Sequence, residues 1–417
     1  MIPPRRFIAA TLGFCVFFAA TLACFNFAVD PYLVFNRPRV VGFNARKPAV
    51  ETQERWMKIY QAARAQARTV ILGSSRTDLG LDPTSSAWPQ AMRPVFNLSF
   101  LGASLTPSLV ALRVMVDRTP PAERPHWVVV GLDFESFLSP PGVPAPARSA
   151  PTVNEMSERV AALDGADRTP WPAKRIVQDY ALASLTLDAT VASLDTLVSN
   201  RGSGGYDLKP TGMYSDAKMR EWTRSDGAAA LFAQKNEMME RELGNPKQVL
   251  RGTPGGPIAG MDALDALFDL ARRNGIALIL MIQPPHASYL DRLDDMGYWP
   301  DYERWKLALV RHASRAKAEG IDVTLWDFGG YEAYAREPVP PAGDRSREMQ
   351  WYWDPLHYKS RFGEQMIDAA MGRPTLFPAD VRLTPGNVEF RLAEVRRERD
   401  EYRSRSASLA TGVVQAP

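Results

Sequence analysis

The chain has 417 residues, of which 45% are hydrophobic and 23% are charged. These proportions are ordinary for a globular protein and argue against a wholly disordered chain or a membrane protein of many spans. Lysine and arginine number 50 against 47 aspartates and glutamates, so no basic excess indicates a nucleic-acid partner. The two cysteines are Cys15 and Cys24, which excludes a disulfide framework and cysteine-based chemistry from the rest of the chain.

The N-terminus carries an uncharged stretch, residues 7–29, directly after Arg5 and Arg6. At about 1.5 Å per residue, a helix of this length crosses a bilayer core of about 30 Å. We predict a transmembrane anchor over residues 1–30. Small residues within the stretch leave a cleaved signal peptide as one alternative. Residues 21–24, Thr-Leu-Ala-Cys, leave a lipoprotein processing site as another.

Basic residues flank both ends of this stretch, so the positive-inside rule does not decide its orientation. The short N-terminal tail and the signal-like layout favour an N-terminus in the cytoplasm and a body outside it. The proline-containing residues 31–48 are predicted to form a juxtamembrane linker.

Short apolar runs alternate with helical patterns on both sides of a long central segment. We predict strands at 69–72, 94–98, 127–131, 276–282 and 323–326, and helices at 51–67, 105–116, 261–274, 302–319 and 362–371. Strands that alternate with helices form a parallel sheet with helices on both faces. The predicted fold class is therefore α/β, a three-layer parallel sheet over residues 49–375 that follows the transmembrane helix.

The alternation breaks between the third and fourth predicted strands. Residues 139–150 are rich in proline and alanine and indicate a loop, whereas 176–198 and 216–243 have helical patterns. We predict an insertion over residues 140–260. A charged C-terminal tail is predicted over residues 376–417, with a helix that faces solvent.

Polar residues stand where the predicted strands end. In such sheets, active sites lie at the carboxyl ends of the strands. The first strand ends in Gly-Ser-Ser-Arg (73–76), the third is followed by Asp133 and the fourth by His286, while Asp354 and His357 precede the last helix. A Gly-Ser-Ser turn or a single histidine is usually structural, but several polar ends on one sheet edge favour a functional site.

These motifs resemble the SGNH (GDSL-like) hydrolase superfamily, in the membrane-anchored branch that includes cell-envelope O-acetyltransferases of the alginate type. The resemblance covers roughly residues 68–135 and 275–372. It implies that Ser75 is the nucleophile and that Asp354 and His357 form the acid–base pair found before the last helix of the family.

The residue types suit acyl transfer. A serine hydroxyl needs a base, and a histidine held by an aspartate accepts its proton near neutral pH. The resemblance further implies that the backbone N–H groups of Ser75 and Gly102 form an oxyanion hole. Asp133 stands where the family commonly has asparagine, and an ionised carboxylate cannot donate to an oxyanion. The alternatives are that Asp133 is protonated, that it points elsewhere, or that another group supplies the third donor. A pairing of Asp133 with Arg76 is a further alternative.

Arg76, Asp133 and His286 are further candidates for contact with substrate. For His286, the alternative is a loop histidine that caps a turn. No metal-ligand spacing and no nucleotide-binding glycine pattern stands out, so we expect neither a metal nor a cofactor.

The sequence and the resemblance together predict a membrane-anchored serine enzyme that adds or removes an acyl group, acetyl by resemblance, on an envelope or exported polysaccharide. They imply a single-pass inner-membrane protein with its catalytic domain in the periplasm, and a polytopic membrane acyltransferase as a candidate partner. A plain esterase would differ only in its acceptor. The alternative is a non-catalytic glycan-binding or assembly subunit of a polysaccharide export complex, in which Asp133 reflects lost catalysis.

Overall fold

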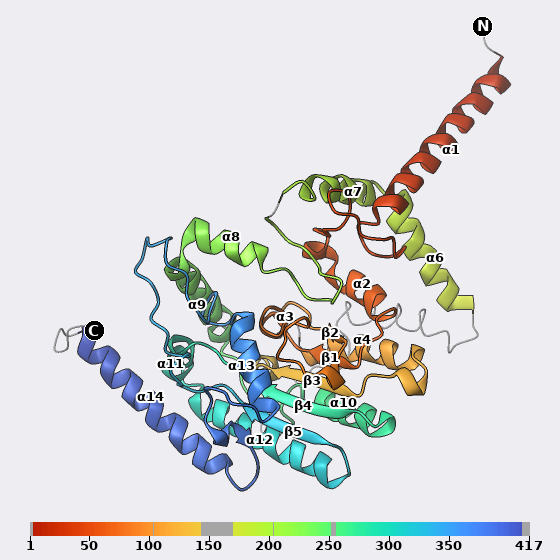
Figure 1. Ribbon diagram of the computed structural model, residues 1–417. Coiled ribbons are helices and arrows are strands. Elements are labelled where there is room, and N and C mark those ends of the chain that lie inside the picture. The colour runs from red at the N-terminus through yellow and green to blue at the C-terminus, as the bar shows by residue number, and fades with distance from the viewer. Residues whose placement is uncertain (1–2, 103, 143–169, 203, 252–255, 411–417) are drawn as a thin grey trace.

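The computed structural model describes residues 3–102, 104–142, 170–202, 204–251 and 256–410 (Figure 1). Its centre is a six-stranded sheet with the order β2-β1-β3-β4-β5-β6. The strands are β1 (Thr69–Leu72), β2 (Val95–Asn97), β3 (Trp127–Leu132), β4 (Ala277–Ile282), β5 (Val323–Asp327) and β6 (Arg382–Leu383). The first five run parallel, and β6 pairs antiparallel with β5. This confirms the α/β prediction.

The strands form because their side chains are largely apolar on both faces and many are β-branched, as expected for a covered parallel sheet. Val128 and Val130 of β3 belong to one hydrophobic core, whereas Val129 between them belongs to the core on the other face. In the register of the sheet, Val130 lies opposite Leu72 of β1 and Leu280 of β4. The strand order turns back between β1 and β3, and ligands of doubly wound sheets bind at such a point.

Helices pack on both faces of the sheet (Figure 1). One core includes side chains of α2 (Val50–Ala62), α4 (Leu105–Arg118), α10 (Met261–Asn274) and α12 (Trp299–Ala318), and the opposite core includes α13 (Ser360–Ala370). Three shorter elements at strand ends were not predicted: α3 (Ser75–Gly80), η3 (Phe134–Phe137) and α11 (Ala287–Asp295). The remaining 3-10 helices are η1 (Gln90–Met92), η2 (Pro121–Glu123) and η4 (Ala379–Val381).

The helical patterns of the insertion each contain a break. The first pattern forms α6 (Pro170–Leu185) and α7 (Leu187–Ser199), because the Thr186 side chain caps α7 by accepting from the Ala189 N–H. The second forms α8 (Ala217–Asp226) and α9 (Ala228–Gly244), divided by Gly227 at a φ of 84°. Residues 143–169, which hold most of the predicted loop, lie outside the described residues.

The C-terminal helix α14 (Val388–Ala410) differs from its prediction. One of its faces is packed: Leu392 and Val395 are buried in the core, and Arg391 is 1% exposed. The expectation of a solvated helix is therefore wrong for this face. The charged pattern concealed a packed stripe because long arginine side chains occur on both sides of the helix.

The N-terminal helix α1 (Pro4–Val29) projects from the body of the molecule (Figure 1). Among the described residues, α1 is the one helix long and apolar enough to cross a membrane, unless α6 and α7, bent by 59°, are counted together as a broken span. The structure thus has one long apolar N-terminal helix, consistent with an anchor or a signal sequence. Residues 31–48 are packed against its end: the buried Lys47 ammonium donates to the carbonyls of Val29 and Asp30.

Candidate active site

The three residues implied as nucleophile, base and orienting acid lie together at the carboxyl edge of the sheet. Ser75 Oγ is 2.8 Å from His357 Nε2, and His357 Nδ1 is 2.6 Å from Asp354 Oδ2. Ser75 and His357 are 282 positions apart in the chain. With its Nδ1 proton directed to the carboxylate, the imidazole presents Nε2 as an acceptor to the serine hydroxyl, the arrangement that activates a serine nucleophile.

Asp354 is held by its own turn as well as by the imidazole. Its Oδ1 accepts hydrogen bonds from the backbone N–H groups of Leu356, at 2.8 Å, and His357, at 2.9 Å. Burial alone would raise the pKa of Asp354, but the charge and hydrogen bond of His357 outweigh it and lower the pKa to about 2. Asp354 is therefore ionised at neutral pH and fixes the ring orientation.

Ser75 stands at the first position of α3, immediately after the turn that leaves β1. The Ser74 hydroxyl caps this helix by accepting the Arg76 N–H at 3.2 Å. A short helix that starts at the strand end therefore sets the position of the Ser75 side chain.

A close contact between α3 and α13 sets the approach of Ser75 to His357. A Cβ atom at Gly80 would collide with the ring of Tyr358, and one at Gly363 would collide with the carbonyl oxygen of Gly80. Glycine at both positions lets the two backbones touch, and both helices adjoin residues of the Ser75–His357 pair.

Arg76 forms a buried ion cluster beside the nucleophile. Its guanidinium lies 3.1 Å from Asp133 Oδ1 and 3.1 Å from Glu135 Oε2, and the Tyr289 hydroxyl also donates to Glu135. Among the alternatives for Asp133, the structure shows the pairing with Arg76. Burial raises the pKa of Asp133, while Arg76 acts in the opposite direction.

Gly102 lies in the loop after β2, at a φ of 58° in the left-handed region. This loop is tied to its surroundings: the Phe100 N–H donates to the Gly73 carbonyl at 2.9 Å, and the Leu101 N–H donates to the Glu54 carboxylate at 3.1 and 3.2 Å. The Ser75 and Gly102 N–H groups remain the predicted oxyanion donors.

His286 is placed differently from the other candidates. It is 2% exposed and caps α11, with Nδ1 beside the Ser288 hydroxyl at 2.9 Å and Nε2 beside the Glu337 carbonyl at 2.8 Å. Burial lowers its pKa to about 4. This geometry is that of the capping alternative, and His286 does not line the cavity that contains Ser75.

A cavity of about 490 Å³ opens onto Ser75, Asp354 and His357. Most of its wall comes from the predicted insertion, which includes the aromatic residues Tyr206, Tyr214 and Trp222, the apolar Met219, Leu231 and Met238, and the cations Lys218, Lys235 and Arg241. Sequence reasoning did not identify these wall residues. The amphipathic patterns of α8 and α9 were visible, but not the surface on which they pack.

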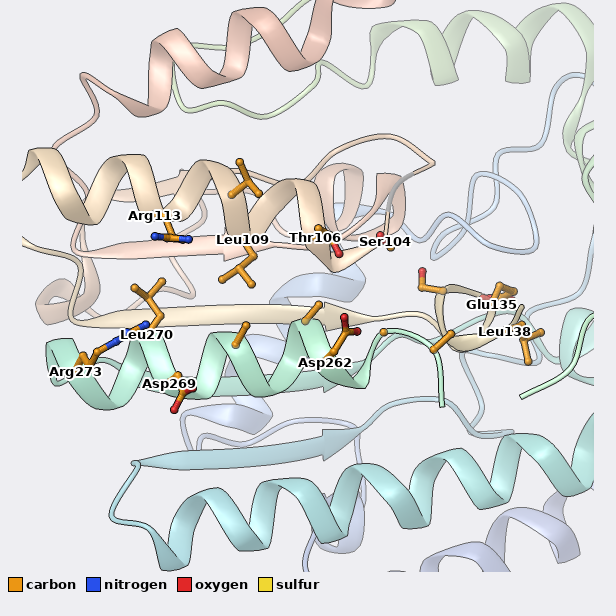
Figure 2. Close-up of a pocket in the computed structure, with 16 residues that line it drawn as sticks. Ser104, Thr106, Leu109, Arg113, Glu135, Leu138, Asp262, Asp269, Leu270 and Arg273 are labelled. Carbon is orange, nitrogen blue, oxygen red and sulfur yellow. The ribbon is translucent and has the colours of Figure 1, made fainter. Parts of the chain in front are cut away.

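A larger cavity of about 650 Å³ lies in a groove between α4 and α10 (Figure 2). Its lining includes two arginines, Arg113 and Arg273, and two aspartates, Asp262 and Asp269. It contains none of the three residues of the hydrogen-bonded chain. Glu135 links the two regions, since it lines this groove and also pairs with Arg76.

Over the described residues, no group of three histidine, cysteine, aspartate or glutamate side chains is placed to hold a metal ion. No protein-family description matches the chain, and no curated protein gives a significant match. The findings thus assign an α/β protein with a mostly parallel six-stranded sheet and a long apolar N-terminal helix.

Proposed function

We propose that this protein is a membrane-anchored serine acyl-transfer enzyme of the SGNH type that acts outside the cytoplasm on an envelope or exported glycan. The observation that carries the proposal is the continuous chain of hydrogen bonds from Ser75 through His357 to Asp354, which opens onto a cavity at the carboxyl edge of the sheet. A perturbed carboxylate, a base and a nucleophile within hydrogen-bond distance favour acyl transfer over a purely structural role.

In the proposed reaction, His357 takes the Ser75 proton as Oγ attacks the acyl carbonyl. The tetrahedral intermediate collapses to an acyl-serine, and the imidazolium returns its proton to the leaving oxygen of the donor. The acceptor hydroxyl then gives its proton to His357 and attacks the acyl-serine, and the imidazolium returns this proton to Ser75 Oγ as the acylated acceptor leaves. Asp354 stabilises the imidazolium in both half-reactions.

The cavity supports an acceptor larger than water. Its volume of about 490 Å³ is within the range of small-molecule sites, and aromatic side chains such as Tyr206 and Trp222 offer surfaces for sugar rings. An anchored enzyme would receive an acyl group at the membrane, so a polytopic acyltransferase partner belongs to the same proposal. The apolar run continues through Phe25, Phe27 and Val29, beyond the small residues Ala19, Ala20 and Ala23, and this favours a retained anchor over a cleaved signal peptide.

The second candidate is a non-catalytic glycan-binding or assembly subunit. The observation in its favour is the pairing of Asp133 with Arg76, which leaves this position without the side-chain donor that asparagine would supply. In the catalytic proposal, the backbone N–H groups of Ser75 and Gly102 stabilise the oxyanion without it.

Labelling with a fluorophosphonate probe separates the two candidates. The wild-type protein is expected to form a covalent adduct at Ser75, and Ser75→Ala to lose it with at least a roughly 1,000-fold fall in acyl-transfer rate. Ser215→Ala is the matched control, since Ser215 lines the same cavity but is outside the chain of hydrogen bonds. A wild-type protein that is folded and unlabelled would favour the binding subunit. Product analysis with an added oligosaccharide then distinguishes a transferase from an esterase.

A further inference from the structure

The bent pair α6–α7 has an inverted burial pattern. Its buried positions include the small or polar residues Ala183, Ala189 and Ser193, whereas Leu185 at 53% and Leu187 at 76% are exposed at the bend. A helix pair packed on a water-soluble body buries its large apolar side chains instead. Small residues inside and large apolar residues outside are typical of helices that face lipid.

These exposed residues form a continuous stripe on α7. Leu187, Val191, Leu194 and Val198 follow one another at intervals of three and four residues, which places them on one side of the helix. Each is more than half exposed, at 76%, 56%, 52% and 66% in that order. Over the length of the helix, the stripe therefore has no partner among the residues that the structure describes.

Exposed apolar residues gather around the base of α1. Besides α6 and α7, the turn after α1 exposes Val40, Val41 and Phe43, and the Asn44 side chain of this turn donates to the Val29 carbonyl at 3.3 Å. In the described body of the protein, the other large apolar side chains that are exposed are Trp222, Leu376 and Phe390. A concentrated apolar patch of this kind marks an interaction surface.

The end of α1 fixes the level of this patch relative to the anchor. The buried Asn26 donates to the Ser184 carbonyl at 2.8 Å and to the Thr190 hydroxyl at 3.1 Å, and accepts from the Ser193 hydroxyl at 2.8 Å. In Figure 1, α6 and α7 diverge from the base of α1, with their bend next to it. The last two turns of α1, Leu22–Val29, are partly covered there, about 10 Å of helix at 1.5 Å per residue.

We infer that the bend of α6–α7 and the apolar stripe of α7 lie in the membrane interface, inserted into the leaflet nearest the body of the protein. The inference rests on the membrane insertion of α1 proposed above, but not on the acyl-transfer chemistry. With α1 inserted, anything packed against its last two turns lies at the level of the headgroups and upper acyl chains, the depth that interfacial helices occupy.

The polar residues of the region agree with an interfacial position and oppose a full span. Asp188 and Asp195, seven residues apart on one side of α7, are exposed beside the apolar stripe. Because charged carboxylates are costly to insert into lipid, the side of α7 that carries them would face water or the lipid headgroups. Arg37 lies 4.8 Å over the ring of Phe27 at the end of α1, where a guanidinium reaches lipid phosphates.

The inserted bend would also fix the distance of the candidate active site from the membrane. Ala183 and Ala189 pack in the same hydrophobic cluster as Leu79, which belongs to α3, the helix that starts with Ser75. The interface contact and the nucleophile are therefore parts of one packed unit. We call the bend and the stripe of Leu187, Val191, Leu194 and Val198 the collar. Inserted in the interface, the collar would hold the cavity at a fixed distance from the membrane surface.

The test uses the full chain in vesicles of phosphatidylcholine and phosphatidylglycerol, with an environment-sensitive fluorophore on single cysteines. Leu187→Cys and Val191→Cys, each in a Cys15→Ser, Cys24→Ser background, report on the collar. Leu376→Cys is the matched control, because Leu376 is an exposed apolar residue, at 63%, outside the collar. The native Cys15, in a Cys24→Ser protein, reports on the anchor.

Labels at positions 187 and 191 are expected to emit at shorter wavelength than the label at 376. Nitroxide lipids labelled near the headgroup should quench them several-fold more strongly than they quench the control. Equal quenching at 187, 191 and 376, with Cys15 quenched, would overturn the inference and leave a partner protein to cover the patch. Stronger quenching by nitroxides at the chain end would show a deep span and also overturn it. An unquenched Cys15 would instead refute the anchor.

Discussion

Two clusters of buried charge lie at the carboxyl edge of the sheet, and they differ in what surrounds them. The Arg76 cluster, with Asp133 and Glu135, follows β1 and β3 and adjoins Ser75. It lies between the cavity that contains Ser75 and the groove that contains Glu135.

The Arg391 cluster lies at the end of β5, and all of its side chains are buried from solvent. Lys306 of α12 donates to Asp327 at 2.8 Å, and Arg391 of α14 pairs with Glu332. Lys306 and Asp327 are fully buried. Buried charges of this kind are costly to leave unpaired and serve to fix the elements that carry them.

The comparison teaches that buried, strongly perturbed charge does not by itself mark a functional site. Both clusters follow strand ends of the same sheet, and both shift pKa values: the charges of Glu135 and Asp133 raise that of Arg76 against the effect of burial, and burial lowers that of Lys306. What singles out the first is the position of Arg76 directly after Ser75, whose hydroxyl pairs with His357 in an open cavity.

Removal of Arg391 is expected to have the largest effect on stability. Arg391→Ala leaves Glu332 and Asp327 buried with fewer partners, which costs about 3–5 kcal/mol. Urea unfolding followed by tryptophan fluorescence measures this loss, while Ser75 labelling per folded molecule should stay unchanged. Arg397→Ala, on the exposed face of the same helix, is the control and should change stability little. Equal losses in the two variants would contradict a sealed cluster.

The pH dependence of stability tests a buried carboxylate outside both clusters, Asp78, which pairs with Lys58 at 3.4 Å. Burial raises the pKa of Asp78 to about 7, from 3.8 in its ordinary state. The folded state therefore holds this proton more tightly than the unfolded state does. Its contribution to stability is present below the unfolded pKa and is lost as pH rises through about 7.

Asp78→Asn should remove this contribution, so that the stability difference between wild type and variant changes by on the order of 3 kcal/mol between about pH 4 and about pH 8. Unfolding at several pH values measures it. Asp117→Asn, at an exposed position of α4, is the matched control and should follow the wild-type curve. The comparison is between the two proteins because buried His286, with its pKa lowered to about 4, acts in the opposite direction in both. Parallel curves for wild type and Asp78→Asn would show that Asp78 is ionised in the folded protein.

Replacement of Arg76 by lysine is expected to have the smallest effect, and on rate rather than on stability. Lysine keeps the charge but loses the planar fork that reaches Asp133 and Glu135 together. A shift of the neighbouring Ser75 then slows fluorophosphonate labelling about 10- to 100-fold. Arg391→Lys makes the same exchange in the other cluster and should not slow labelling. Equal labelling rates in both variants would reduce the Arg76 cluster to a structural role.

The sequence predicted the parts of the fold that have a clear apolar run or a full helical pattern. The five parallel strands and α10, with its stop at Gly275, have strong apolar signals and agree with the structure closely. The strand β6 has two residues and α3 has six, so neither contains enough of a period to predict. The burial of Arg391 was also unpredictable, because its partners come from other elements.

The hydrogen-bonded residues of the candidate site were predictable from the sequence, but the residues that line the rest of its cavity were not. Their positions at strand or helix ends indicated one sheet edge for Ser75, Asp354 and His357, and the family resemblance selected these three among the polar ends. The structure brings them within hydrogen-bond distance. Residues such as Trp222 and Lys235 line the cavity only through the docking of α8 and α9, which no local pattern specifies.

The contact of Gly80 with Gly363 and Tyr358 has a consequence for how the chain tolerates change. Because the backbones of α3 and α13 touch there, the separation of Ser75 from His357 depends on packing within the sheet domain. The insertion lies between these residues in the chain but takes no part in that contact. Insertion residues that line the cavity but lie outside the core cluster around Leu79, such as Trp222 and Met238, can therefore change while the reacting atoms keep their distance, so that selection on substrate preference and selection on reactivity act on different residues of the protein.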